Sequence, residues 1–459
     1  MSLTLCIPLA ACALLLLPLC VVNFRRVYIL YLFAFMPAYL FFRDLFIKFT
    51  GQDLPDILKA LKDIAWVYVL LAAVQWFLLT NKKLFRSEIV TVWLVFVAYL
   101  LVCLVRGANL LGWFGSMYAI RGMFLYLPVV LLTVVLFSNK FDIIKVIRYF
   151  LYFLMAGGIY NLVQVVFRMP QNYIILRQEQ KQHWASSSFF ADYNQFGLFC
   201  VIGLALLLSL AGSRVFSKRF SLLAVLLMTV GVLTSNSRTG IVTSAAVIAV
   251  VVYTGAPRIK RLLLPAVVLG AACLLLMTIY GYHPFASHRI AGGFANDPRF
   301  RTIWPILWRI YERSPLFGYG WGVFGYTAYK IGHDILGMGG MQLVDSFYLL
   351  LLLNTGLVGA GLFCLFLFTL FRSSLRGLRH TGDPELRSLG IGLDAALLAY
   401  LVYMIGTNYL EGVPTNIYFW LLVGMKVVLD RIVRMQHGIE CLSSNTRLAA
   451  AKGAWEMAV

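Results

Sequence analysis

Long apolar blocks alternate with short polar segments along the whole chain. A helix of about 17–25 apolar residues is long enough to cross a bilayer, and in lipid a helix satisfies its own backbone polar groups. The pattern predicts thirteen spans, with an error of one or two, at residues 3–22, 27–43, 64–80, 89–105, 123–137, 149–167, 195–212, 221–235, 239–255, 262–281, 344–371, 388–408 and 415–429. The predicted fold is an all-α, polytopic bundle of about 12–14 transmembrane helices. The first block lacks a basic leader and is interpreted as a retained helix.

Lysine and arginine gather in alternate short loops, and this bias predicts the orientation of the chain. The loops concerned carry Arg25 and Arg26; Lys82, Lys83 and Arg86; Lys140, Lys145 and Arg148; Arg214, Lys218 and Arg219; Arg258, Lys260 and Arg261; and Arg372, Arg376, Arg379 and Arg387. Arg431, Arg434, Arg447 and Lys452 follow in the tail. These segments are predicted to be cytoplasmic, and the C-terminus with them.

Three long polar segments, at about 44–63, 168–194 and 282–343, fall on the opposite, external side. Loops of such length are usually functional. The last one is predicted to form a subdomain of short helices near the membrane interface. This divides the chain into N-terminal helices (1–281), a large loop (282–343), C-terminal helices (344–433) and a tail (434–459).

Composition agrees with a membrane protein. Of 459 residues, 61% are hydrophobic and 13% charged, with a mean hydropathy of +0.83. These values exclude a soluble enzyme, a disordered chain and a secreted disulfide scaffold. The net charge of +20 is assigned to topology and anionic lipid rather than to nucleic acid. The cysteines show no CxxC or Cys/His spacing, so neither disulfides nor a metal site is expected.

The external segments between residues 106 and 345 are nevertheless rich in arginine. Their basic residues are Arg106, Arg121, Arg168, Arg177, Lys181, Arg238, Arg289, Arg299, Arg301, Arg309, Arg313 and Lys330, against the acids Glu179, Asp192, Asp297, Glu312, Asp334 and Asp345. The arginine side chain presents a rigid fork that matches phosphate geometry. The excess therefore favours an anionic ligand at the outer leaflet, with contacts to lipid headgroups and ordinary ion pairs as the alternative.

Individual arginines sharpen this prediction. Arg238 lies in TSNSRTG, a short polar turn between two apolar blocks, where an ionisable group usually faces a cavity or a partner. Arg121 lies where a span begins, so a helix N-terminus would assist anion binding. For both, the alternative is a side chain that extends to the membrane surface. On a helix, Arg301, Trp304, Trp308 and Arg309 would share one face, suited to the interface, provided that Pro305 lies early in that helix.

Three acid–base side chains are candidates for a general base. His333 and Asp345 flank the end of the large loop, and Glu411 lies in the last external loop. The alternative for Asp345 is an N-cap of the following helix, and for the other two an incidental surface position. Asp394 is the one predicted acid deep in a span. It is expected either to pair with a buried cation or hydroxyl or, in a transporter, to carry a proton.

Taken together, these segments resemble the O-antigen ligase and O-antigen polymerase superfamily of bacterial envelope enzymes. TSNSRTGIVTSAAVIAVV resembles its SR-G motif, RFRTIWPILWRIYERSPLFGYGWGVF its R-x-x-W…P-L-x-G-x-G-x-F stretch, and VDSFYLLLLLNTGLVGAGLF its post-loop helix, while DYNQFGLFCVIGLALL is a weaker match. The resemblance covers roughly residues 190–365. It implies a GT-C-like, inverting glycosyltransferase that needs no metal or other cofactor. Such an enzyme moves an undecaprenyl-diphosphate-linked glycan onto an acceptor hydroxyl at the periplasmic face of the inner membrane, with the diphosphate held at positions that match Arg238 and Arg301.

One departure from the motif favours the polymerases of the superfamily over its ligases. Ligases of the superfamily carry His-Asn before the post-loop helix, where this chain has Asp345 and Ser346. The leading hypothesis is therefore a Wzy-like polymerase, with Arg121 or Arg309 assisting at the diphosphate and Asp345, His333 or Glu411 as base. Trp304, Trp308 and Tyr348 are expected to contact the sugars. A ligase acting on lipid A core or on protein is the alternative. A transporter is a further one, favoured by paired ionisable residues at depth and repeated halves, neither of which the sequence displays. A chain-length regulator and a flippase are candidate partners.

Overall fold

The computed structural model describes residues 20–50, 56–80, 87–167, 186–190, 192–211, 213, 215–235, 237–253, 299–331, 344–377 and 382–456. The first part of the chain forms α2 (Phe24–Leu30), η1 (Tyr31–Phe35), α3 (Met36–Thr50), α4 (Asp56–Thr80), α5 (Glu88–Gly122), η2 (Phe124–Tyr126), α6 (Val129–Leu136), α7 (Lys140–Val166), α9 (Tyr193–Leu210), α10 (Lys218–Thr234) and α11 (Arg238–Tyr253). The second part forms η4 (Arg299–Ile303), α14 (Trp304–Tyr311), α15 (Tyr326–Ile331), α16 (Phe347–Gly377), α17 (Pro384–Tyr403), η5 (Tyr409–Glu411) and α18 (Thr415–Glu456).

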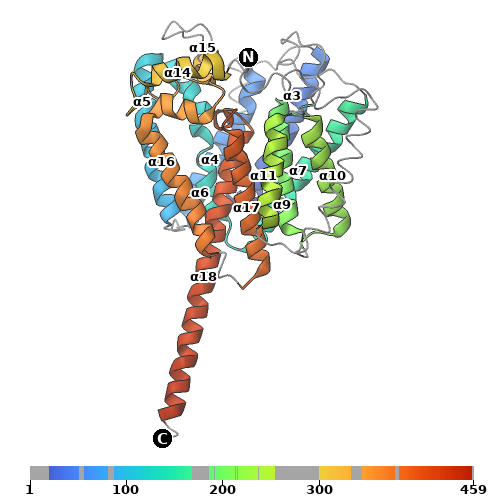
Figure 1. The fold of residues 1–459 in the computed structure, drawn as a ribbon, viewed down its shortest axis with the longest axis vertical. Helices are drawn as coiled ribbons and strands as arrows, with labels where there is room; N and C mark the ends of the chain where they lie inside the picture. The colour runs from blue at the N-terminus through green and yellow to red at the C-terminus, as the bar shows by residue number, and fades with distance from the viewer. Residues whose placement is uncertain are drawn as a thin grey trace.

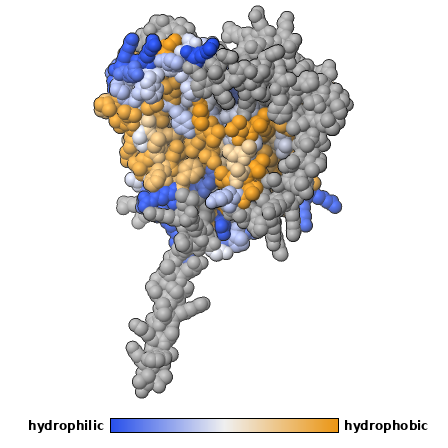
Figure 2. Space-filling model, viewed as in Figure 1, coloured by the Kyte–Doolittle hydropathy of each residue, from blue (hydrophilic) through white to orange (hydrophobic). Residues whose placement is uncertain are grey.

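The fold is an all-α helix bundle, as the hydropathy pattern predicts. Among the described residues there is no strand, and seven helices are long and apolar enough to cross a membrane, or eight if the bent pair Phe114–Gly122 and Phe124–Leu136 is one span. Figure 2 shows an apolar band across the described surface, with polar residues above and below it. The chain is a multi-pass membrane protein. The predicted spans 3–22 and 262–281 lie, all but the last three residues of the first, outside the described residues.

Figure 1 shows α14 and α15 lying across one end of the bundle, which we call the outer end. At the opposite end, called the inner end, α18 leaves the bundle as a single long helix. Several inner helix starts are capped by side chains that accept a backbone N–H. The Asn139 carboxamide accepts from Asp142 N at 3.0 Å, and the Asp383 carboxylate accepts from Glu385 N at 2.8 Å. Lys140 then pairs with Asp383 at 2.7 Å, which ties α7 to α17 at this end.

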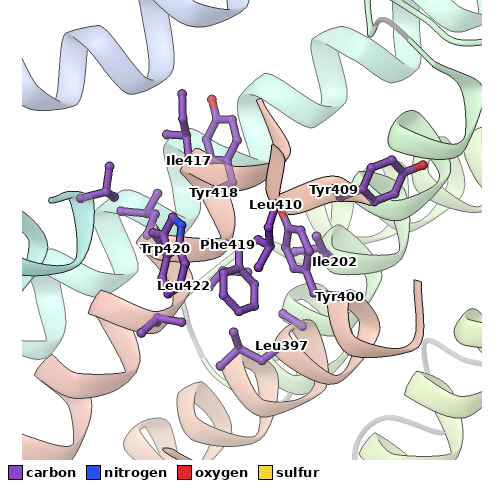
Figure 3. Packing of buried hydrophobic residues seen from close by; sticks show 14 of the residues in the cluster. Ile202, Leu397, Tyr400, Tyr409, Leu410, Ile417, Tyr418, Phe419, Trp420 and Leu422 are labelled. Atoms are coloured by element: carbon purple, nitrogen blue, oxygen red, sulfur yellow. The ribbon is translucent and has the colours of Figure 1, made fainter. Parts of the chain in front are cut away.

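The centre of the bundle is α9, which is buried along almost its whole length. It packs against α10, α11 and α17, while α18 packs against α6, α16 and α17. Figure 3 shows rings of α17 and α18 meeting near Ile202 of α9. Tyr400 and Phe419 form an edge-on pair with ring centroids 5.3 Å apart. Because lipid is as apolar as these side chains, the association depends on close packing rather than on exclusion of water.

The described part of the large loop consists of short helices, as predicted. Pro305 lies in the first turn of α14, directly after the π-helical turn η4. The following glycines Gly318, Gly320, Gly322 and Gly325 all have positive φ values. The segment GYGWG is therefore tight backbone that returns from α14 to the bundle rather than a free surface loop.

Candidate active site at the outer end of α17 and α18

The connection between α17 and α18, residues 404–414, is where the outer segments of the chain converge. The N–H of Phe347, at the start of α16, donates to Met404 O at 3.0 Å. The Arg299 guanidinium reaches the same segment and donates to Gly406 O at 3.4 Å. The large loop and the last two spans are thereby held against one short stretch of backbone.

Arg299 forms an ion pair with Asp345. The Nε atom of Arg299 lies 2.9 Å from Oδ2 of Asp345, and the two side chains are 41% and 37% exposed. Asp345 thus stands at the head of α16 as the partner of an arginine. Asp345 does not hold the N-cap position of α16, because the helix begins at Phe347 and Ser346 precedes it directly.

Glu411 is the buried acid of this site. Its side chain is 7% exposed, and Oε2 accepts from Tyr326 N at 3.0 Å and from Asn408 Nδ2 at 2.5 Å. Among the described residues Oε1 has no hydrogen-bond partner. Burial raises the pKa of the Glu411 carboxyl to about 7, against the opposing effect of the two N–H donors. A carboxyl that titrates near neutral pH and has a free oxygen is suited to proton transfer.

A second acid, Asp192, lies beside this connection. It caps α9 by accepting from Asn194 N at 3.1 Å, and its Oδ2 accepts from the Tyr409 hydroxyl at 3.2 Å. Burial raises the pKa of Asp192, and the negative charge of Asp345 raises it further. Asp192, Asp345 and Glu411 therefore converge on one connection, from α9, α16 and η5.

The predicted SR-G turn adjoins the same place. Ser237 accepts from Gly240 N at 3.1 Å as α11 begins, and its hydroxyl lies 3.5 Å from the Tyr403 hydroxyl at the end of α17. A methyl group at Gly240 would collide with the Tyr403 hydroxyl, so glycine permits this approach of α11 to α17. The turn thus brings the start of α11, Arg238, to the outer end of α17. The side chain of Arg238 and all of His333 lie outside the described part of the chain.

The other predicted residues have separate environments. Arg121 pairs with Asp63, Nε to Oδ2, at 2.5 Å and donates to Lys59 O. In this structure it therefore binds α4. Tyr348 donates its hydroxyl to Leu401 O at 2.8 Å, which joins α16 to α17. Arg301 and Arg309 are exposed, with no ion pair to the described residues. Trp304 is partly buried, whereas Trp308 is 50% exposed.

Asp394 is paired, one of the two outcomes that its position predicts. Lys426 of α18 lies 2.5 Å from it, with its own side chain only 2% exposed. Sequence reasoning counted Asp394 as the single acid at depth and overlooked Lys426 within an apolar block. It also counted Arg299 and Asp192 only as members of the external charge set, and passed over Asn408 and Tyr409. The polar run NYLEGVPTN around Glu411 was the available signal for the last two.

Comparison with known proteins agrees with the resemblance. Residues 223–364 match the family model described as O-antigen ligase, which supports the O-antigen ligase and polymerase superfamily and a glycosyltransferase-like activity in general. The matched segment runs from α10 through the SR-G turn and the large loop into α16, so it includes Arg299 and Asp345 but ends before Glu411. No curated protein sequence matches the chain.

Proposed function

We propose that the chain is a polysaccharide polymerase of the O-antigen ligase and polymerase superfamily. It would transfer an undecaprenyl-diphosphate-linked glycan, with inversion, to a hydroxyl of another lipid-linked repeat unit. The reaction would take place at the periplasmic face of the bacterial inner membrane, with the C-terminus in the cytoplasm. The observation that carries the proposal is Glu411: a buried carboxyl with one unpartnered oxygen, on the same connection that receives Arg299.

The proposed chemistry divides between the base and the cations. As a carboxylate, Glu411 accepts the proton of the acceptor hydroxyl while that oxygen attacks the anomeric carbon. The bond from the anomeric carbon to the diphosphate breaks, and the leaving diphosphate carries the new negative charge. Arg238 and Arg301 are the proposed diphosphate ligands, with Arg309 beside them. Positive groups held in place before the reaction stabilise such developing charge.

This assignment gives Asp345 a different role from that of base. A carboxylate that is already paired with a guanidinium holds the arginine in position. The departure from the ligase motif also supports a polymerase, because Asp345 stands where the ligases have histidine. Trp308, which is half exposed on α14, remains the proposed sugar contact.

Reconstitution tests the proposal directly. The purified protein in nanodiscs is incubated with undecaprenyl-diphosphate-linked repeat units from its own host, without metal or nucleotide, and the products are read by gel ladder and mass spectrometry. A ladder of longer lipid-linked glycans is expected. Donor consumption only after addition of lipid A core or a protein acceptor would replace the polymerase with a ligase.

A lipid-linked glycan transporter is the second candidate, favoured by the pair of Asp394 with the buried Lys426. The same nanodisc preparation separates the two. A transporter leaves the glycan chain length unchanged and moves the donor across the bilayer, which a membrane-impermeant lectin detects. A polymerase lengthens the chain.

A further inference from the structure

α16 is interrupted inside its span, and the large loop repairs the interruption. Gly356 has φ 66°, so the helix cannot make its regular hydrogen bonds there. The N–H groups of Tyr319 and Gly320 donate to Leu353 O and Asn354 O, at 2.8 and 2.9 Å. In return, Leu357 N donates to Pro315 O at 2.8 Å. Irregular backbone within a span is tolerated where protein satisfies it in this way.

Asn354 extends this contact to the far end of the GYGWG segment. The side chain is fully buried and forms hydrogen bonds with both the N–H and the carbonyl oxygen of Phe324. Its Oδ1 accepts from Phe324 N at 3.1 Å, and its Nδ2 donates to Phe324 O at 3.3 Å. A carboxamide supplies both halves of this pair from one planar group, an acceptor oxygen and a donor N–H.

The residues that follow Phe324 lie against Glu411. A methyl group at Gly325 would collide with the Glu411 carboxylate, which shows how closely the loop backbone approaches it. The next N–H, that of Tyr326, donates to Glu411 Oε2 at 3.0 Å. Asn354 thus binds the backbone of Phe324, two residues before Tyr326, whose N–H binds the buried acid.

We propose that Asn354 is a positioning residue, which fixes the Phe324–Tyr326 backbone so that the Tyr326 N–H is directed at Glu411. This inference rests on the proposed function, in which Glu411 is the base. Asn354 itself touches neither substrate nor Glu411. It acts through the loop, so that the break in α16 serves to aim a donor at the site.

The surroundings of Glu411 make its proton affinity sensitive to this donor. On its own turn lies Tyr409, whose hydroxyl is bonded to Asp192 at the start of α9. From α5, Gly122 approaches the backbone of Glu411, and Arg121 beside it is paired with Asp63. Burial raises the pKa of Glu411, and the N–H donors of Tyr326 and Asn408 lower it. No charged group among the described residues adds to these effects. Loss of the Tyr326 N–H should therefore raise that pKa, by about one unit for a hydrogen bond to a charged group.

The experiment compares Asn354→Ala with Asn139→Ala in the full-length protein in nanodiscs. Asn139 caps α7 at the inner end, where its carboxamide accepts from Asp142 N at 3.0 Å, so it controls for the general effect of losing a structural carboxamide. Two properties are measured. Hydrogen–deuterium exchange of the peptide spanning 321–328 reports the loop, and the pH dependence of kcat/KM for glycan transfer reports Glu411.

In Asn354→Ala, exchange at the Phe324 and Tyr326 amides should be at least tenfold faster, and the pH midpoint of kcat/KM should move upward by about one unit from about 7. Asn139→Ala should change neither. Unchanged exchange would overturn the proposal whatever reaction the protein catalyses. Faster exchange with an unmoved pH midpoint would overturn it as well, because Asn354 would then be purely structural.

Failure of the proposed function is distinguishable. If Glu411→Gln polymerises at the wild-type rate, Glu411 is not the base. The pH midpoint then reports another group, and the role of Asn354 toward catalysis is overturned together with it. If Glu411→Gln is inactive and Asn354→Ala shifts the midpoint, both are supported. In the Glu411→Gln background, Asn354→Ala should then produce no pH shift.

Discussion

The acidic side chains of α17, α18 and the connection between them fall in two regions, and their partners differ. Within the bundle, Asp394 pairs with Lys426 at 2.5 Å and Asp430 with Arg434 at 2.9 Å. At the outer connection, the partners of Glu411 among the described residues are the N–H donors of Tyr326 and Asn408. The first two acids thus each have a cation as partner, whereas burial among neutral donors raises the pKa of the Glu411 carboxyl to about 7. The first arrangement suits structure, and the second suits proton transfer.

The largest effect should come from the outer acid. Glu411→Gln keeps the shape and the acceptor for Tyr326 N–H but cannot take a proton, so kcat for glycan transfer should fall by about 10²–10⁴-fold. Ladder formation in nanodiscs measures it. Glu385→Gln, at the inner end and paired with Lys140 at 3.1 Å, is the matched control and should retain activity. Wild-type polymer length from Glu411→Gln would mean that the outer acid is not the base.

The paired region should respond in stability instead. Asp394→Asn leaves the Lys426 ammonium buried without its partner, which should destabilise the protein by about 3–5 kcal/mol. The double variant Asp394→Leu with Lys426→Met should recover most of this loss, because both charges are removed. Thermal unfolding in detergent measures both variants. A stable Asp394→Asn protein that fails only in glycan movement would instead favour the transporter.

The proposed diphosphate ligands at the outer end provide the next effect. Arg301→Ala and Arg238→Ala should each lower kcat by about 10²–10³-fold, the usual loss for one stabilising donor in a transition state. Membrane insertion should be unaffected. Arg26→Ala, an exposed arginine of the predicted cytoplasmic set, is the control. Full-length polymer from either variant, at wild-type expression, would remove the diphosphate site from this end of the bundle.

The sequence predicts the helices better than the contacts between them. Apolar blocks locate the spans, and the early position of Pro305 in α14 follows from proline geometry. The break at Gly356 is not visible in the sequence, since it lies within one continuous apolar run and depends on a loop some forty residues earlier. The pairs of Arg299 with Asp345 and Lys426 with Asp394 are likewise products of packing. The Arg-rich outer end was a visible signal, but which arginine binds which acid was not.

The smallest effect is a difference in stability between Glu411→Gln and the wild type, which should grow as the pH rises. Burial raises the pKa of Glu411 from 4.5 to about 7, so its contribution to folding is fully present below pH 4.5 and is lost as pH rises through 7. At pH 8 the wild type bears the whole burden of an ionised buried carboxylate, roughly 3 kcal/mol. Glu411→Gln should therefore unfold at a higher temperature than wild type at pH 8 and at nearly the same temperature at pH 4.5. Glu385→Gln, at the inner end and about a third exposed, is the control at both pH values. A constant difference for Glu411→Gln between pH 4.5 and 8 would mean that burial does not raise the pKa of Glu411.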